Sequence, residues 1–321
     1  MKDNTIEVRV KRIAHEAHDI KSFELGYADD TCLPPFEPGA HIDVHVAPGV
    51  VRQYSLCNAP GQDCSYLIAV KKEPASRGGS LGLHERVKEG DTLVIGLPRN
   101  LFALAPQAAR HLLIGAGIGI TPLLAMAQHL KHAGADFSLH YFGRSAEHMA
   151  FHGLLCGAGF GGRVTLHPGL APDAVQETLG RLLERRPPDA HLYLCGPGPF
   201  MEQVRAQAAR AWPDEAVHFE YFAADPALGA APAGSFEVAL ARSGGCYRVG
   251  ESESIVEVLA RHGIAVDVSC EQGVCGTCVT TVLEGVPEHR DMYLSEAEKK
   301  SCRQMTPCVS RALSARLVLD L

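Results

Sequence analysis

Residues 270–278 read CEQGVCGTC, and this short stretch decides how the last third of the chain folds. It places three cysteines close together, with four residues in the first gap and two in the second, and a fourth cysteine follows after twenty-nine more residues. These four cysteines are Cys270, Cys275, Cys278 and Cys308. Gly273 and Gly276 stand between the first three, and glycine permits the tight turns that point backbone N–H groups toward sulfur atoms. The stretch therefore predicts a loop that gathers thiolates around a metal centre.

The spacing favours a [2Fe–2S] cluster of the plant ferredoxin type, in which four thiolates hold two irons and two sulfides. A structural zinc site is one alternative, but such sites usually pair two short cysteine knuckles, and only one short pair is present here. A second alternative concerns the fourth ligand, because Cys302 lies only six residues before Cys308. Spacing alone leaves both cysteines open for that position.

Composition and charge restrict the function classes. The chain carries 30 Lys and Arg against 37 Asp and Glu, a formal charge of −7, which argues against nucleic-acid binding. No apolar run approaches the roughly 18 residues that a membrane span needs. The start, MKDNTIEVRVKR, lacks the apolar core of a secretory signal, so we expect a cytoplasmic protein. Its eleven cysteines are then expected to be metal ligands or buried thiols rather than disulfides.

The sequence predicts a multidomain chain of α+β and α/β units. Residues 1–104 alternate apolar and polar positions between Pro- and Gly-rich turns, which predicts a small antiparallel β-barrel with one helix near 81–87. Residues 105–223 alternate strands with helices, which predicts a doubly wound parallel sheet. Residues 224–235 are rich in Ala, Pro and Gly and read as an interdomain linker, or alternatively as a long surface loop. Residues 236–321 form the cysteine-bearing unit.

The run VRQYSLCNAP in the first unit contains a candidate flavin site, which resembles the R-x-Y-S motif of the ferredoxin reductase flavin domain. Its candidate residues are Arg52, Gln53, Tyr54 and Ser55. The arginine can pair with a flavin phosphate through bidentate hydrogen bonds, the tyrosine can pack on the ring, and the serine can hydrogen-bond near the reactive edge. The alternative is an ordinary strand that has one exposed arginine and binds no flavin.

A second run, IAVKKEPASRGGSLGLHE, strengthens the flavin prediction. A Gly-rich turn that leads into a helix N-terminus presents free N–H groups to an anion such as phosphate. Arg77 is a further candidate phosphate partner, although a solvated loop arginine is equally compatible with the sequence. By resemblance, the flavin ring is lined by Ala69, Val70 and Lys71. The flavin phosphate is received by Gly78, Gly79 and Ser80.

The segment GAGIGITP predicts a nicotinamide dinucleotide site at a strand-to-helix turn, where glycines let the backbone approach a pyrophosphate. Tight packing alone could also require these glycines. The spacing differs from the Rossmann fingerprint and matches the ferredoxin reductase version. Its candidate residues are Gly115, Ala116, Gly117, Ile118, Gly119, Thr121 and Pro122. By resemblance, Thr121 also reaches the flavin and the nicotinamide.

Five further residues, in three places along the sequence, complete the candidate site. In the ferredoxin reductase family the segment Cys195, Gly196 and Pro197 lies beside the nicotinamide, and a buried structural thiol is the alternative for Cys195. Arg144 follows the strand where the adenine ribose is read, so it could contact a 2′-phosphate and favour NADPH. Phe222 is placed by resemblance to stack on the flavin, and an ordinary core aromatic is the alternative. We expect Ser55, Thr121 and Cys195 to be the residues closest to the reaction.

Taken together, nearly the whole chain resembles the phthalate dioxygenase reductase and vanillate demethylase reductase group. The resemblance implies a flavin barrel, an NAD domain and a C-terminal β-grasp ferredoxin domain, with FMN rather than FAD and NADH rather than NADPH. It also implies Cys308, rather than Cys302, as the fourth cluster ligand.

The implied activity is that of an electron-transfer reductase. NADH would reduce FMN by hydride transfer, and electrons would pass singly to the [2Fe–2S] cluster and on to a Rieske-type terminal oxygenase for an aromatic substrate. We expect a transient complex with that partner and a monomer otherwise. The alternatives are a reductase for a cytochrome P450 or other monooxygenase, and a cluster-bearing redox sensor without turnover.

Overall fold

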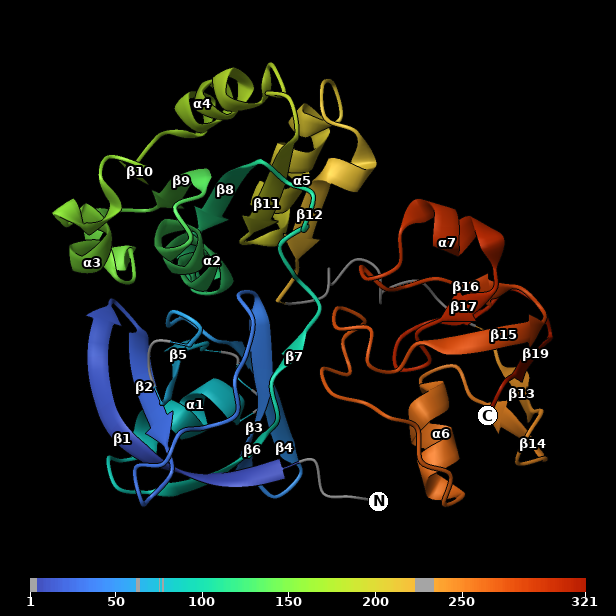
Figure 1. The fold of residues 1–321 in the computed structure, drawn as a ribbon. Coiled ribbons are helices and arrows are strands. Elements are labelled where there is room, and N and C mark those ends of the chain that lie inside the picture. Colours follow the sequence, from blue (N-terminus) through green and yellow to red (C-terminus); the bar gives the residue numbers. More distant parts are fainter. Residues whose placement is uncertain (1–4, 62–63, 75, 77, 223–233) are drawn as a thin grey trace. The chain divides into compact units, whose positions relative to one another are not determined.

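The computed structural model describes residues 5–61, 64–74, 76, 78–222 and 234–321 (Figure 1). It divides into two compact units, residues 1–220 and 221–321. The first unit contains two sheets, and the predicted boundary between residues 104 and 105 remains a prediction. The expected linker at 224–235 lies outside the described residues except for its last two, and Arg77 lies outside them as well.

The first sheet is antiparallel and is built from the β-rich part of the sequence. Its strands follow the order β4-β3-β6-β1-β2-β5, and β7 pairs with β3. The strands are β1 (Thr5–Ala17), β2 (Ile20–Gly26), β3 (Ala40–Ala47), β4 (Val50–Ser55), β5 (Tyr66–Lys71), β6 (Thr92–Gly96) and β7 (Arg99–Asn100). The path does not close through a full ladder; a single bridge between Leu56 and Ile68 joins its two ends. The expected barrel is therefore an antiparallel sheet whose end strands meet at one bridge.

Alternation of apolar and polar residues explains how this sheet buries one face. In β1, Val8 and Val10 are buried while Glu7 and Arg9 are exposed, as a half-buried strand requires. The single helix of this region, α1 (Gly79–Glu85), lies where the sequence predicts one near 81–87.

The second sheet of the first unit is fully parallel, in the order β10-β9-β8-β11-β12, as predicted for a doubly wound fold. Its strands are β8 (Arg110–Ala116), β9 (Asp136–Gly143), β10 (Val164–Pro168), β11 (Ala190–Cys195) and β12 (Val217–Glu220). Its helices are α2 (Ile120–His132), α3 (His152–Cys156), α4 (Pro172–Leu183) and α5 (Gly198–Ala208), with short 3-10 turns η1 (Gly117–Gly119), η2 (Ala146–His148), η3 (Ala158–Phe160) and η4 (Asp214–Ala216). Because the strands are parallel, their carboxyl ends share one edge, where ligands bind in such folds.

Helix α2 joins the two sheets of the first unit. Its buried side chains, among them Leu124, belong to one core cluster with Cys57 and Ala69 from the antiparallel sheet. In addition, the Gln128 side chain donates a hydrogen bond to the Cys57 carbonyl oxygen at 2.7 Å. Helix α2 therefore packs against residues of the antiparallel sheet, whose strands also enclose a separate core cluster of their own.

The second unit contains a mixed sheet in the order β14-β13-β19-β15-β17, with β13 and β19 parallel, and a small β16-β18 ladder. Its strands are β13 (Phe236–Leu240), β14 (Cys246–Val249), β15 (Thr280–Glu284), β16 (Pro287–Glu288), β17 (Gln304–Met305), β18 (Arg311–Ala312) and β19 (Arg316–Leu319). Its helices are α6 (Ile255–Arg261) and α7 (Glu296–Ser301). Each begins at a capping box, from Ser254 and Glu257 and from Ser295 and Glu298, which satisfies the first free N–H groups.

One expectation about the cysteines is wrong. Cys32 and Cys64 form a disulfide in the first unit, whereas the sequence predicts reduced thiols. The loop after β2 runs beside the loop before β5, as the hydrogen bond from Leu33 N to Cys64 O at 3.1 Å records. A separation of 32 residues hides this proximity from a reading of the sequence. No helix among the described residues is long and apolar enough to cross a membrane.

Candidate functional site

The four predicted ligand cysteines lie together in the second unit as two pairs. Cys278 Sγ lies 3.2 Å from Cys308 Sγ. The thiols of Cys270 and Cys275 are hydrogen-bonded to each other. Among the described residues, no three His, Cys, Asp or Glu side chains converge on one ion site. Two pairs match a cluster in which each of two irons takes two thiolates.

One thiol in each pair has a lowered pKa. Hydrogen bonds from Cys270 and Thr277 lower the pKa of Cys275 to about 5, and the Cys308 thiol lowers the pKa of Cys278. Thr277 Oγ1 lies 3.3 Å from Cys275 Sγ, within hydrogen-bonding distance. Since the thiolate is the form that binds iron, these contacts favour ligation.

The two glycines of the loop have positive φ angles, 70° at Gly273 and 71° at Gly276, as the sequence predicts for tight turns. A Cβ atom on Gly276 would lie 2.2 Å from the ring of Tyr293, and one on Gly273 would lie 2.5 Å from Val309 Cγ2. Any larger residue would push these neighbours away from the loop. The loop is therefore closely packed as well as tightly turned.

Cys302, the alternative fourth ligand, lies apart from this group. It ends helix α7 in the left-handed conformation, with its thiol 3.6 Å from the Lys299 carbonyl oxygen. The short distance between Cys278 and Cys308 accordingly favours Cys308.

In the first unit, the structure brings together two parts of the predicted phosphate site. A Cβ atom on Gly79 would lie 2.6 Å from Cγ and 2.9 Å from Nε of Arg52, so the arginine side chain lies directly on this glycine. Arg52 Nη1 donates to the Val51 carbonyl oxygen at 2.7 Å. Gly78 has a φ of 89°, which only glycine adopts easily. A guanidinium and a glycine turn thus meet at one place.

The other predicted flavin residues lie on the neighbouring strands. Tyr54 is half-buried in β4, and burial raises its pKa above the usual value. Gln53 Nε2 lies 3.2 Å from Nε2 of the buried His41. Ser80 Oγ accepts a hydrogen bond from Glu73 N at 3.1 Å. In β5, Ala69 and Val70 are buried, and Lys71 forms an ion pair with Glu73.

The Gly-rich turn after β8 packs against the end of β11. A Cβ atom on Gly119 would lie 2.3 Å from the Cys195 carbonyl oxygen and 2.6 Å from Gly196 N, so only glycine fits. The Tyr141 hydroxyl donates to the Gly117 carbonyl oxygen at 2.9 Å and fixes the turn from the β9 side. Sequence reasoning missed this tyrosine, which has no motif of its own. The two segments predicted to meet the nicotinamide are therefore neighbours.

The remaining predicted residues occupy varied surroundings. The Thr121 hydroxyl is buried and donates to the Ile118 carbonyl oxygen at 3.0 Å. Arg144 is exposed after β9, and Phe222, in the second unit, is 38% exposed. The other predicted positions flank the Gly-rich turn or precede α5: Gly115 and Ala116 end β8, Pro122 lies in the first turn of α2, and Pro197 comes directly before α5. Their cofactor contacts stay predictions.

A glutamate that the sequence did not single out completes the site. Ser55 Oγ, at the end of β4, lies 3.3 Å from Glu220 Oε2, at the end of β12. Cys195 is directly opposite Glu220 in the parallel ladder of β11 and β12. Burial raises the pKa of Glu220 to about 8, while burial and the Glu220 carboxylate raise that of Cys195. Ser55 and Cys195, which we expect near the reaction, thus lie beside the Glu220 carboxyl group, which holds its proton at neutral pH.

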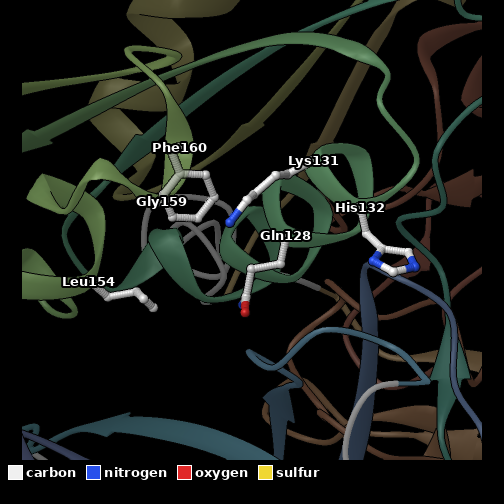
Figure 2. A pocket seen from close by; sticks show the side chains of 6 residues that line it. All are labelled: Gln128, Lys131, His132, Leu154, Gly159 and Phe160. Atoms are coloured by element: carbon white, nitrogen blue, oxygen red, sulfur yellow. The ribbon is translucent and has the colours of Figure 1, made fainter.

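A small cavity of about 180 Å³ lies elsewhere, at the carboxyl end of α2 (Figure 2). Figure 2 shows Lys131 near the ring of Phe160, with Gln128 beside them. One of the lining residues, Gln128, donates the hydrogen bond to the Cys57 carbonyl oxygen, two residues after Ser55.

Comparison with known proteins decides the family. Residues 238–313 match the 2Fe-2S iron-sulfur cluster binding domain. A vanillate O-demethylase oxidoreductase of Pseudomonas putida is 49% identical over 95% of this chain and 96% of its own length. The structure of a phthalate dioxygenase reductase, described as a modular structure for electron transfer from pyridine nucleotides to [2Fe-2S], superposes with a TM-score of 0.77. It shares 39% identity and covers 100% of this chain and 99% of that one.

The chain belongs to the phthalate dioxygenase reductase family. Its predicted fold class is confirmed, with flavin- and NAD-binding regions followed by a C-terminal [2Fe–2S] domain. Its predicted activity, that of an NADH-dependent oxidoreductase serving an oxygenase, is confirmed at the level of the family.

The residues present fit both groups of this family. The two thiol pairs provide the four sulfur donors that a [2Fe–2S] cluster requires. Gly273 and Gly276, with their positive φ angles, give the loop its tight turns. The absence of a side chain at Gly79 lets Arg52 lie against the glycine turn, and a guanidinium beside a glycine turn suits the phosphate of a flavin. Together, a bound flavin and cluster would accept two electrons as a hydride and pass them on one at a time.

Proposed function

We propose that this chain is the FMN-dependent reductase component of a Rieske-type terminal oxygenase acting on an aromatic substrate such as a methoxylated benzoate. One observation supports the partner assignment most strongly. The relatives at 49% and 47% identity, from two Pseudomonas strains, are both named vanillate O-demethylase oxidoreductases and align over nearly their whole lengths. The reductase itself need not bind the aromatic substrate, so the partner carries the substrate specificity.

In this proposal Arg52 binds the FMN phosphate and the Gly-rich turn after β8 binds the NADH pyrophosphate. The turn can do so because Gly117 has a φ of 55° and no atom lies within 4 Å of the place that a Cβ would occupy, which leaves its backbone open to a ligand. Thr121 follows at the start of α2, and Arg144 is available for the adenosine ribose.

Ser55, Glu220 and Cys195 orient the reacting groups. The carboxyl group of Glu220 is neutral at pH 7 because burial raises its pKa to about 8, so it can share a proton with Ser55 Oγ. Burial likewise keeps the Cys195 thiol protonated, which excludes a thiolate nucleophile at this place. These three groups are therefore uncharged at neutral pH.

Reconstitution with purified oxygenases tests the partner. We expect NADH-driven O-demethylation of vanillate with a vanillate-type terminal oxygenase, and little turnover with oxygenases for non-aromatic substrates. Equal support of every oxygenase in the panel would overturn the partner assignment. Flavin released by acid should be FMN on chromatography, and FAD would overturn the flavin assignment.

A reductase for a cytochrome P450 is the second candidate. A type IV self-sufficient cytochrome P450 monooxygenase matches 99% of this chain over 41% of its own length, with 34% identity and a TM-score of 0.83. The same module can thus be fused to a P450 in another protein. Including a P450 in the reconstitution panel distinguishes the two candidates.

We further propose that the protein is a cytoplasmic monomer that meets its oxygenase only transiently. Electron-transfer partners typically form small interfaces that are guided by charge, because each encounter must end quickly. Size-exclusion chromatography with light scattering, alone and with the oxygenase, tests this. A stable stoichiometric complex would contradict it.

A further inference from the structure

A buried carboxyl group lies behind the cysteine loop, and the four ligands do not explain it. Asp291 is 1% exposed, although aspartate is among the residue types that are least often buried. Burying such a group costs free energy unless polar partners surround it. The partners of Asp291 therefore indicate what the residue does.

On one side, Asp291 is connected to the segment that carries Cys308. Its Oδ1 accepts a hydrogen bond from Ser310 Oγ at 3.4 Å. Ser310 is itself 1% exposed, lies two residues after Cys308, and is 3.0 Å from Thr306 Oγ1. The backbone N–H of Arg290, the residue before Asp291, also donates to Ser310 Oγ, at 3.2 Å. The carboxyl group thus anchors the segment of the fourth ligand.

On the other side, Asp291 lies against the loop that carries the first three ligands. A Cβ atom on Gly273 would lie 3.1 Å from Asp291 Cα and 3.2 Å from its Cβ. The neighbouring Met292 N donates to the Gly273 carbonyl oxygen at 3.0 Å. The turn that makes these contacts is held by the Asp291 side chain, whose Oδ2 accepts from Leu294 N at 2.7 Å.

We propose that Asp291 is a positioning residue that fixes the three-cysteine loop relative to the Cys308 segment, and so holds the four thiolates at the spacing a [2Fe–2S] cluster requires. Three ligands come from one segment and the fourth from another, so their geometry depends on whatever joins the two. Asp291 contacts both. His289 Nδ1 also lies 3.5 Å from Oδ1, so the imidazole is a further polar neighbour of the carboxyl group.

Two substitutions separate this role from general stability. Asp291→Asn retains the shape but loses one acceptor and the charge. Ser310→Ala keeps the carboxyl group and removes the hydroxyl that contacts Asp291, Arg290 N and Thr306. Asp267→Asn is the matched control, because Asp267 is exposed and lies three residues before Cys270. Each holoprotein is mixed with a ferrous chelator after reduction, and the rate of iron release is measured. The electron paramagnetic resonance spectrum of the reduced cluster is recorded on the same preparations.

We expect iron release about 10- to 100-fold faster in Asp291→Asn, the usual effect of losing a group that orients metal ligands, and a smaller increase in Ser310→Ala. Both variants should show altered g values, whereas Asp267→Asn should match the parent protein. Parental release rates and spectra in both variants would overturn the proposal, even if their melting temperatures fell. If Asp291→Asn retains no cluster, Ser310→Ala decides: faster release supports the proposal and a parental rate overturns it. The test needs neither the oxygenase nor the flavin assignment.

Discussion

Ser55 Oγ and Glu220 Oε2 lie 3.3 Å apart although 165 residues separate them in the sequence. The contact joins the last residue of β4 to the last residue of β12, and so connects the flavin segment to the nicotinamide segment. Burial raises the pKa of Glu220 from 4.5 to about 8. The carboxyl group is therefore the group at this junction whose charge changes near neutral pH.

Glu220→Gln should remove a pH dependence of stability. Because the folded protein holds the Glu220 proton up to pH 8 while the unfolded chain releases it near 4.5, this group's contribution is complete below pH 4.5 and is lost as the pH rises to about 8. The melting temperature of Glu220→Gln, relative to the parent, should therefore rise between pH 5 and pH 8.5. Thermal unfolding followed by circular dichroism measures it. A constant difference across this range would contradict the raised pKa.

Gly119→Ala should damage the nicotinamide site. The new methyl group would lie 2.3 Å from the Cys195 carbonyl oxygen, so the turn must move away from β11. Overpacking of this kind costs about 1–3 kcal/mol, and the displaced turn should raise the KM for NADH about tenfold or more. Gly153→Ala is the control, because Gly153 is exposed in α3 with open space around its Cβ position. A parental KM in Gly119→Ala would show that the turn does not bind the cofactor.

Arg52→Ala should release the flavin. A hydrogen bond to a charged group contributes about 1.5–3 kcal/mol, so the flavin should bind roughly 10- to 100-fold more weakly. Arg52→Lys should restore little of this affinity, since an ammonium lacks the bidentate geometry of a guanidinium. The flavin that remains bound after gel filtration measures the effect. Arg12→Ala, an exposed arginine on β1, should retain the parental amount.

The sequence located the cysteine loop because three of the four candidate ligands share one short stretch. Gly273 and Gly276 have the positive φ angles that their place between cysteines implies. The Gly-rich turn was recognisable for the same reason, since its residues are contiguous. Local patterns of this kind need no knowledge of which strands pair.

Glu220 could not be found in that way. Its position opposite Cys195 depends on the register of β12 against β11, and its contact with Ser55 depends on how two sheets pack. Neither is encoded in the residues around Glu220. The disulfide between Cys32 and Cys64 was missed for a similar reason, because two loops far apart in the sequence meet beside the antiparallel sheet.

Cys275→Ser tests the order of electron transfer. The substitution removes the thiol whose pKa the loop lowers to about 5, so the cluster should be lost or unable to accept electrons. NADH-driven reduction of cytochrome c should fall to background, while reduction of ferricyanide, which can take electrons from the flavin, should persist. Cys302→Ser is the matched control, because its thiol contacts the Lys299 carbonyl oxygen rather than another ligand cysteine, and both activities should remain. Loss of both activities in Cys275→Ser, with flavin still bound, would place the cluster before the flavin or make it essential to NADH oxidation.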